Sequence, residues 1–163
     1  MSVEIAQEDP RWASLDLAEI AERATQALFE HLNIDPSAEL ALLACDDARI
    51  TELNGTFRDK PKATNVLSWP SLERRADQPG QRPEPPQPDA WGAFELGDIA
   101  LGYETCLAEA EAAAIPFEHH VTHLIMHATL HLLGYDHINS ADGDLMEEIE
   151  VEVLASLGLH NPY

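Results

Sequence analysis

The order of hydrophobic and polar positions divides the chain into short strands and longer amphipathic helices. Compact or alternating apolar runs predict strands at residues 3–7, 39–45, 64–69 and 94–101. Apolar residues that recur every three or four positions predict helices at residues 15–32, 48–57, 103–114, 117–133 and, after a cap at Asn139 or Ser140, up to 157. This order predicts an α+β, α/β-like fold with one domain over residues 1–163, in which a mixed sheet of about four strands packs against several helices.

Residues 71–90 interrupt this order. Five prolines lie in the stretch among Gln, Arg, Glu and Asp residues. Because proline fixes φ and has no backbone N–H, the stretch cannot form a helix or a central strand. The composition predicts a flexible surface loop between two strands, partly in the polyproline II conformation. A partner-binding segment is the alternative interpretation, and an insertion of variable length is favoured over it.

Composition excludes several classes of protein. Hydrophobic residues make up 45% of the 163 residues, which is enough for a packed core and too many for a disordered chain. No apolar run approaches the roughly 20 residues of a membrane helix, and the first residues lack the pattern of a secretion signal. Cys45 and Cys106 form no C-x-x-C pair, and free thiols are expected. These features favour a cytoplasmic protein without a membrane partner.

Three histidines carry the clearest chemical signal. His127, His131 and His137 follow the spacing H-x3-H-x5-H, with Gly134 between the second and the third. Residues four apart share one face of a helix, so the first two imidazoles can bind one metal ion together. Gly134 can adopt the left-handed conformation that ends a helix and lets the chain return with His137.

Three neutral imidazoles leave the fourth tetrahedral position open, as in catalytic zinc sites. The sequence therefore predicts one Zn²⁺ per chain, held by His127, His131 and His137 at the end of helix 117–133. The alternative is that these histidines only pack against the helix end or cap it.

Neighbouring residues narrow the chemistry. Zinc peptidases of the H-E-x-x-H type use the glutamate after the first histidine as general base, and Ala128 holds that position here. Peptide hydrolysis by that route is excluded, because alanine cannot accept a proton. His123 lies one turn before His127, but on a straight helix its Cα is about 12 Å from that of His131. We expect His123 beside the metal, either as a buried neighbour or as a catalytic base.

Three stretches resemble the YbeY family of bacterial endoribonucleases. Residues 127–137 read HATLHLLGYDH, against the family pattern H-G-x-L-H-L-x-G-Y-D-H, with Ala128 in place of glycine. Residues 53–70 read LNGTFRDKPKATNVLSWP and resemble L-N-x-x-Y-R-x-K-x-x-x-T-D-V-L-S-F-P, and residues 96–99 match the strand L-G-D-I. The departures in the second stretch are Phe57 for tyrosine, Asn65 for aspartate and Trp69 for phenylalanine.

The resemblance implies an activity and partners. It implies a zinc-dependent, single-strand-specific endoribonuclease that acts in 16S ribosomal RNA 3′ end maturation and ribosome quality control. RNA would be the substrate, and the ribosome or ribosomal proteins would be partners. The resemblance also implies that Arg58 is important for activity. A guanidinium fits a phosphate bidentately, so we expect Arg58 to bind the scissile phosphate and to stabilise its developing charge. A salt bridge from Arg58 to Asp59 or Asp98 is the alternative.

The expected mechanism joins these residues. Zinc lowers the pKa of a bound water towards ~7, and the water attacks an RNA phosphodiester while Arg58 neutralises the phosphate. The general base stays open among that hydroxide, His123 and the RNA 2′-hydroxyl. Asp136 either orients a ligand imidazole or bonds turn amides. Asp98, in a predicted strand, is a further candidate to support the metal ligands, and a buried carboxylate there needs a partner such as a backbone amide or Arg58.

The net charge of −21 argues against nonspecific RNA binding, because such proteins are usually basic. Seven of the nine bases lie between Arg49 and Arg82, and Arg58, Lys60 and Lys62 form a cluster where we expect RNA to approach. Ordinary solvated surface is the alternative for this cluster. Two rival functions remain: a zinc peptidase or amidase on a metzincin-like site, and a non-catalytic ribosome-associated factor with structural zinc.

Overall fold

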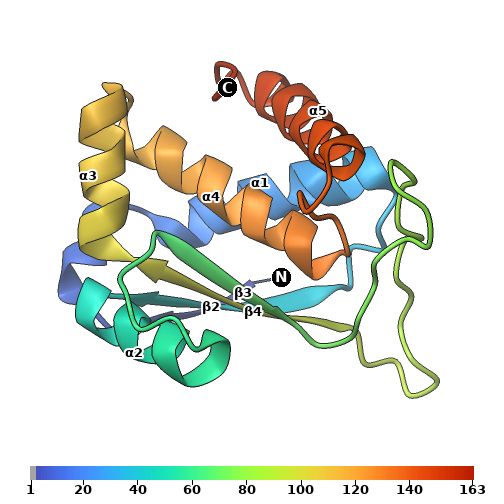
Figure 1. Ribbon diagram of the computed structural model, residues 1–163, viewed down its shortest axis with the longest axis horizontal. Coiled ribbons are helices and arrows are strands. Elements are labelled where there is room, and N and C mark those ends of the chain that lie inside the picture. The colour runs from blue at the N-terminus through green and yellow to red at the C-terminus, as the bar shows by residue number, and fades with distance from the viewer. Residues whose placement is uncertain (1–2) are drawn as a thin grey trace.

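The sheet of the computed structural model, which describes residues 3–163, has four strands and helices on both faces (Figure 1). The strands, in the order β1-β2-β4-β3, are β1 (Val3–Gln7), β2 (Glu39–Cys45), β4 (Glu95–Gly102) and β3 (Val66–Pro70). Strands β1, β2 and β4 are parallel to one another, and β3 runs antiparallel to β4. The predicted α+β class with a mixed four-stranded sheet is confirmed.

The five α-helices begin and end within about two residues of the predicted bounds. They are α1 (Leu17–Leu32), α2 (Asp47–Arg58), α3 (Tyr103–Ala113), α4 (Phe117–Leu132) and α5 (Ser140–Ser156), and a short 3-10 helix, η1 (Pro10–Ser14), precedes them. Side chains of Asp16, Asp46 and Asn139 accept hydrogen bonds from backbone N–H groups and so fix where three of these helices start. The sequence pattern did not predict η1, because five residues with a single buried side chain, Trp12, show no periodicity.

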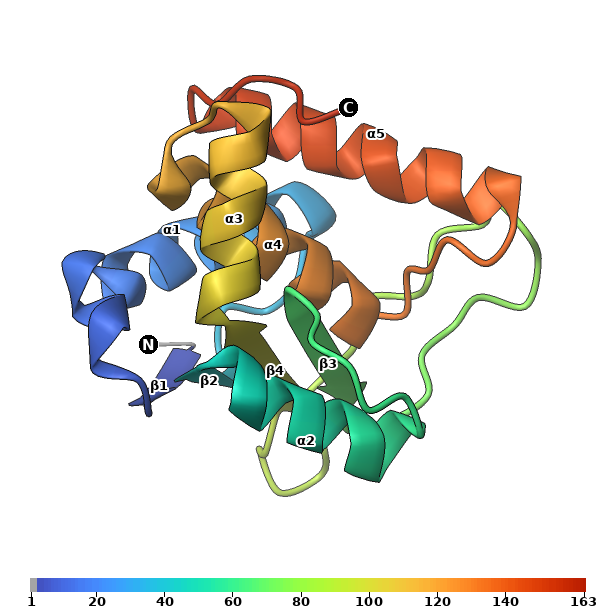
Figure 2. The ribbon, with the colours of Figure 1, turned by 60° about the vertical axis from the view of Figure 1, so that its left-hand side comes forward.

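The helices form two layers above one face of the sheet. α1 and α4 lie nearest the strands, α5 lies beyond them, and α2 covers part of the opposite face (Figures 1 and 2). Parallel neighbours such as β1 and β2 need a crossover, which α1 supplies. The apolar side of α4, including Val121, Ile125 and Ala128, is buried as predicted. Several histidines of α4 line a cavity that this helix shares with the edge strand β3.

The strand predicted at residues 64–69 begins two residues later and includes Pro70. We expected Pro70 to end this strand. β3 lies at the edge of the sheet, where a missing backbone N–H costs no hydrogen bond to a further strand.

Residues 71–94 contain no helix or strand and link β3 to β4, where the proline-rich loop was predicted. Arg74 ties the start of this segment to the core, because its Nη1 donates to the carbonyls of Leu132 (2.9 Å) and Leu96 (3.1 Å). Further along, the N–H of Gly80 donates to the Asp142 carboxylate at 2.8 Å. The flexibility of the segment stays a prediction.

Two expectations from composition concern the cysteines and the membrane. Cys45 and Cys106 are both buried and free. Within residues 3–163, no helix has both the length and the apolar character needed to cross a bilayer.

Candidate functional site

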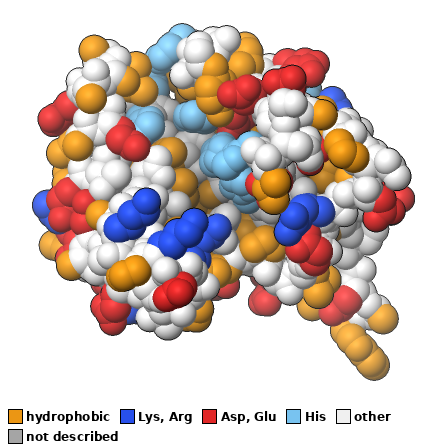
Figure 3. All heavy atoms as spheres, in the orientation of Figure 1, with side chains coloured by type: hydrophobic (Ala, Val, Ile, Leu, Met, Phe, Trp, Pro, Cys, Tyr) orange, Lys and Arg blue, Asp and Glu red, His pale blue; other side chains and the backbone are white. Residues whose placement is uncertain are grey.

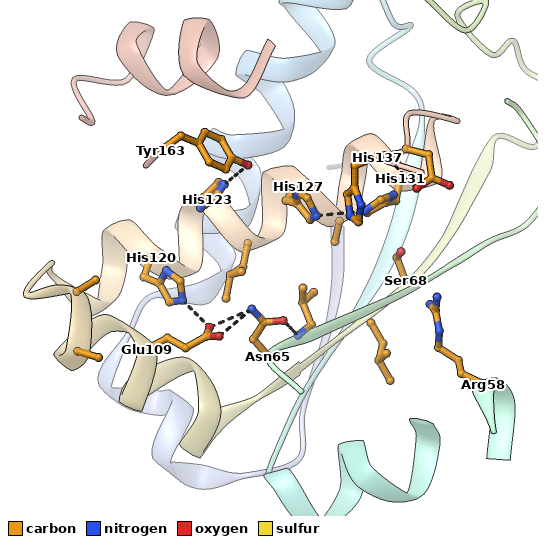
Figure 4. Close-up of a pocket in the computed structure, with 17 residues that line it drawn as sticks. Arg58, Asn65, Ser68, Glu109, His120, His123, His127, His131, His137 and Tyr163 are labelled. Atoms are coloured by element: carbon orange, nitrogen blue, oxygen red, sulfur yellow. Dashed lines mark hydrogen bonds and ion pairs between the residues drawn. The ribbon is translucent and has the colours of Figure 1, made fainter. Parts of the chain in front are cut away.

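A cavity of about 850 Å³ lies between α4, β3 and the end of α2. Figure 3 shows the histidines gathered around this hollow, with Lys and Arg side chains next to it. The polar side chains that line the cavity are Arg58, Asn65, Ser68, Glu109, His120, His123, His127, His131, Asp136, His137 and Tyr163 (Figure 4). Residues from both halves of the chain therefore meet around one space.

The structure brings the three predicted metal ligands together. One nitrogen of each of His127, His131 and His137 lies within 4.8 Å of the other two, and the group can hold a metal ion. The Nε2 atoms of His127 and His131 are 3.1 Å apart. The ring of His137 completes the triangle, with its centroid 5.6 Å from that of His127 and 5.2 Å from that of His131.

The end of α4 makes this convergence possible. Gly134 has φ +104°, and the N–H groups of Gly134 and Tyr135 donate to the carbonyls of His131 (3.1 Å) and Leu130 (3.0 Å). These paired bonds are those of a Schellman motif, which reverses the chain after a helix. The reversal returns His137 to the face that carries the other two rings.

The donor set fits a divalent metal. Nδ1 of His127 lies 2.6 Å from a Glu150 carboxylate oxygen, and Nδ1 of His131 lies 3.0 Å from the Tyr135 carbonyl. A carbonyl and an ionised carboxylate only accept hydrogen bonds, so we assign the proton of each ring to Nδ1. Both Nε2 lone pairs then face each other, at a separation close to the about 3.3 Å expected between two ligands of tetrahedral zinc. A shared cation would remove the repulsion between these two lone pairs.

Burial and the adjacent His127 lower the pKa of His131 to about 4. The ring is therefore neutral at pH 7, as a metal ligand must be.

His123 stands next to this group. It lies 3.6 Å from Glu150 and 3.4 Å from the Tyr163 hydroxyl, and it also lines the cavity. His123, His127 and Glu150 form a second group close enough to hold a metal. That group would use the Nδ1 of His127, which already donates to Glu150, so the geometry favours one ion over two. A role for His123 as base stays a prediction.

Arg58 reaches the cavity from the last turn of α2. Figure 4 shows its guanidinium directed towards the side where the histidines lie. In the described part of the chain it makes no hydrogen bond or ion pair, so the alternative salt bridge to Asp59 or Asp98 is not formed. The buried Asn54 side chain donates to the Lys62 carbonyl at 3.1 Å and shapes the turn that follows Arg58.

Three other predicted residues lie outside the cavity. Lys60 and Lys62 are exposed on the loop after α2 and do not line it. Asp98 is exposed, and it lines hollows on the sheet face that packs against α2. Successive strand residues point to opposite faces, so Asp98 shares the side of Ala100, away from α4. The expectation that Asp98 supports the metal ligands is therefore not met.

Asp136 lies at the site in one of its two expected roles. Its carboxylate accepts a hydrogen bond from the backbone N–H of His137 at 2.7 Å. This is the turn role, which shapes the loop that presents His137.

Sequence reasoning missed several residues of the site. The amide of Asn65 donates to a Glu109 carboxylate oxygen at 2.9 Å, and the same oxygen lies 2.9 Å from Nε2 of His120. Glu150 and Tyr163 were also missed. One signal was present for Glu150: it falls among the buried positions of α5 that include Met146, Ile149 and Val153, where a charge needs a partner.

Replacing Gly134 by Ala is expected to lower the free energy of unfolding by at least about 2 kcal/mol, through a strained φ and a clash. An added Cβ would lie 2.2 Å from the Arg74 carbonyl oxygen. Gly158→Ala is the matched control, because Gly158 has φ +79° but no atom within 4 Å of the added Cβ. Urea unfolding of both variants measures the difference, and equal losses would contradict the clash.

Comparisons with known proteins cover almost the whole chain. A family model described as Endoribonuclease YbeY matches residues 2–158. A Paracoccus denitrificans protein named endoribonuclease YbeY is 53% identical over 161 residues, which cover 99% of this chain and 89% of that protein. A Ruegeria pomeroyi protein of the same name is 51% identical over 164 residues, which cover 100% of this chain and 98% of that protein.

A solved structure has a similar fold. The solution structure of TM1509 from Thermotoga maritima matches with a TM-score of 0.57 and 19% identity, over 96% of this chain and 91% of that one. At this identity the match supports the fold alone. The sequence matches run through the strands, the helices and the histidine turn alike, and on that ground the chain belongs to the Endoribonuclease YbeY family.

Proposed function

We propose that this protein is a zinc-dependent endoribonuclease that hydrolyses phosphodiester bonds in single-stranded RNA. The observation that carries the proposal is the placement around one cavity of three convergent imidazoles and of a guanidinium that has no partner among residues 3–163. The relatives are named endoribonucleases, which supports RNA as the substrate.

Each part of the site has a role in this proposal. His127, His131 and His137 hold the ion through neutral nitrogens, a donor set that suits zinc. When bound, the ion would supply Lewis acidity, which would polarise a phosphoryl oxygen and make a water molecule a stronger acid. Arg58 binds the phosphate and stabilises the charge that grows on it in the transition state. His123 is the candidate base, since it lines the cavity beside His127.

The rival functions have less support. A structural zinc site is normally closed by four protein ligands, whereas three histidines here border an open cavity of about 850 Å³. A zinc peptidase of the H-E-x-x-H type needs a carboxylate next to the first histidine, and Ala128 is buried there.

The biological role that we propose is maturation of the 16S ribosomal RNA 3′ end and ribosome quality control, in the cytoplasm. The motif resemblance supports this role. A net charge of −21 weakens binding to RNA alone, so contacts with the ribosome or its proteins would supply affinity. Arg58, Lys60 and Lys62 are exposed together at the end of α2, where they provide local positive charge beside the cavity.

A nuclease assay tests the proposed activity. Zinc-loaded protein is expected to cleave single-stranded RNA, to leave casein intact and to lose cleavage when a chelator removes the metal. Circular dichroism should show that the metal-free protein remains folded, because two of the three ligands sit on a helix that packing already stabilises. Cleavage that is unaffected by chelation would exclude the metal mechanism, and unfolding on chelation would favour structural zinc.

A further inference from the structure

Glu150 is the only acid without solvent exposure among residues 3–163. It lies on α5, behind the metal-binding face of α4, and it does not line the large cavity. Burying a carboxylate is costly unless hydrogen bonds compensate. The buried carboxylate of Glu150 is therefore expected to have a specific role in the protein.

Three side chains contact this carboxylate. Nδ1 of His127 lies 2.6 Å from one oxygen, and Nε2 of His123 lies 3.6 Å from the same atom. The hydroxyl of Tyr163 donates to the other oxygen. Each oxygen of the Glu150 carboxylate therefore has a hydrogen-bond partner, His127 at one and Tyr163 at the other.

A carboxylate that faces a donor at each oxygen accepts the hydrogen bond from Nδ1 of His127, so it holds the proton there and leaves the lone pair of Nε2 for an ion. Such a carboxylate also fixes the angle of the ring and makes the ligand nitrogen more basic. Without it, His127 could place its proton on Nε2, the atom that faces His131 at 3.1 Å.

Tyr163 completes the arrangement from the segment after α5. The side chain of Asn161 accepts a hydrogen bond from the N–H of Tyr163, at 2.8 Å, and so helps to turn the segment back. The tyrosine ring then stands perpendicular to that of His123, with centroids 5.6 Å apart. Figure 4 shows Tyr163 directed towards His123, on the side of α4 away from Arg58.

We propose that Glu150 and Tyr163 are positioning residues that together hold His127 in its metal-binding tautomer and orientation. Glu150 does so by accepting the hydrogen bond from Nδ1. Tyr163 does so by occupying the second carboxylate oxygen and covering it from water. The inference rests on the proposed metal site at His127, and it does not depend on which substrate the protein cleaves.

The test compares Glu150→Gln with Glu148→Gln. Glu148 is exposed on the same helix, so its variant controls for the loss of one charge from α5. Competition with a chromophoric chelator is expected to give Zn²⁺ binding about 10- to 100-fold weaker for Glu150→Gln, as for other carboxylates that support a histidine ligand. Glu148→Gln is expected to bind Zn²⁺ as the unaltered protein does. Equal affinity of the two variants would overturn the proposal.

Tyr163→Phe tests the same contact from an exposed residue. It removes only the hydroxyl, so the fold is expected to persist and Zn²⁺ binding to weaken several-fold, less than for Glu150→Gln. Binding equal to that of the unaltered protein would remove Tyr163 from the proposal.

Nitrogen-15 NMR of the metal-free protein gives a readout that does not involve catalysis. His127 should carry its proton on Nδ1, whereas Glu150→Gln should show a mixture of tautomers or shift towards Nε2. An unchanged tautomer in Glu150→Gln would refute the positioning role. The proposed nuclease function can fail separately, if the protein binds Zn²⁺ and shows these shifts but cleaves no RNA.

Discussion

Replacing His131 by Ala is expected to weaken Zn²⁺ binding by at least ~100-fold and to abolish RNA cleavage. A direct ligand should matter at least as much as the residues that support it, whose loss costs about 10- to 100-fold. His131 is the central ligand: its Nε2 faces that of His127, and its Nδ1 is fixed by the Tyr135 carbonyl. Native mass spectrometry of the His131→Ala variant and of the unaltered protein measures the metal content of each.

His123→Ala is the control for this prediction. It removes an imidazole from the same helix, two turns earlier, beside the metal group rather than within the three-histidine cluster. We expect a much smaller loss of metal. If His123→Ala empties the site while His131→Ala keeps its zinc, the group of His123, His127 and Glu150 is the metal site, and the assignment must be reversed.

Replacing Arg58 by Ala is expected to slow RNA cleavage by about 10²–10³-fold, comparable to the loss of one charge-stabilising donor in other enzymes. Metal content and the free energy of unfolding should not change, because Arg58 is exposed and makes no ion pair in the described structure. Single-turnover cleavage of a labelled RNA separates the chemical step from binding.

Two further variants show whether the effect needs the guanidinium or only its charge. Arg58→Lys keeps the charge but loses the bidentate fork, so an intermediate rate is expected. Lys62→Ala removes a nearby exposed charge from outside the cavity and should change the rate only a few-fold, by an amount that salt screens. Equal effects of Arg58→Ala and Lys62→Ala on the cleavage rate would contradict a specific phosphate-binding role for Arg58. They would indicate that it acts only as part of a diffuse basic surface.

Local features of the sequence were enough to predict much of this protein. Apolar periodicity located the strands and the five α-helices, and the side chains that cap helices marked several of their starts. The histidine spacing and Gly134 also predicted a group that the structure does bring together. These predictions succeeded because each depends on residues a few positions apart, whose relative placement one helix and one turn determine.

Tertiary structure decided the rest of the site. Whether Arg58 reaches the histidines depends on how α2 and β3 pack beside α4, and Asp98 faces α2 because of its register in β4. The contacts of Glu150 and Tyr163 with His127 and His123 depend on α5 and on the segment that follows it. No short-range sequence pattern predicts such contacts, because they form when elements distant in sequence bury their apolar faces against one another.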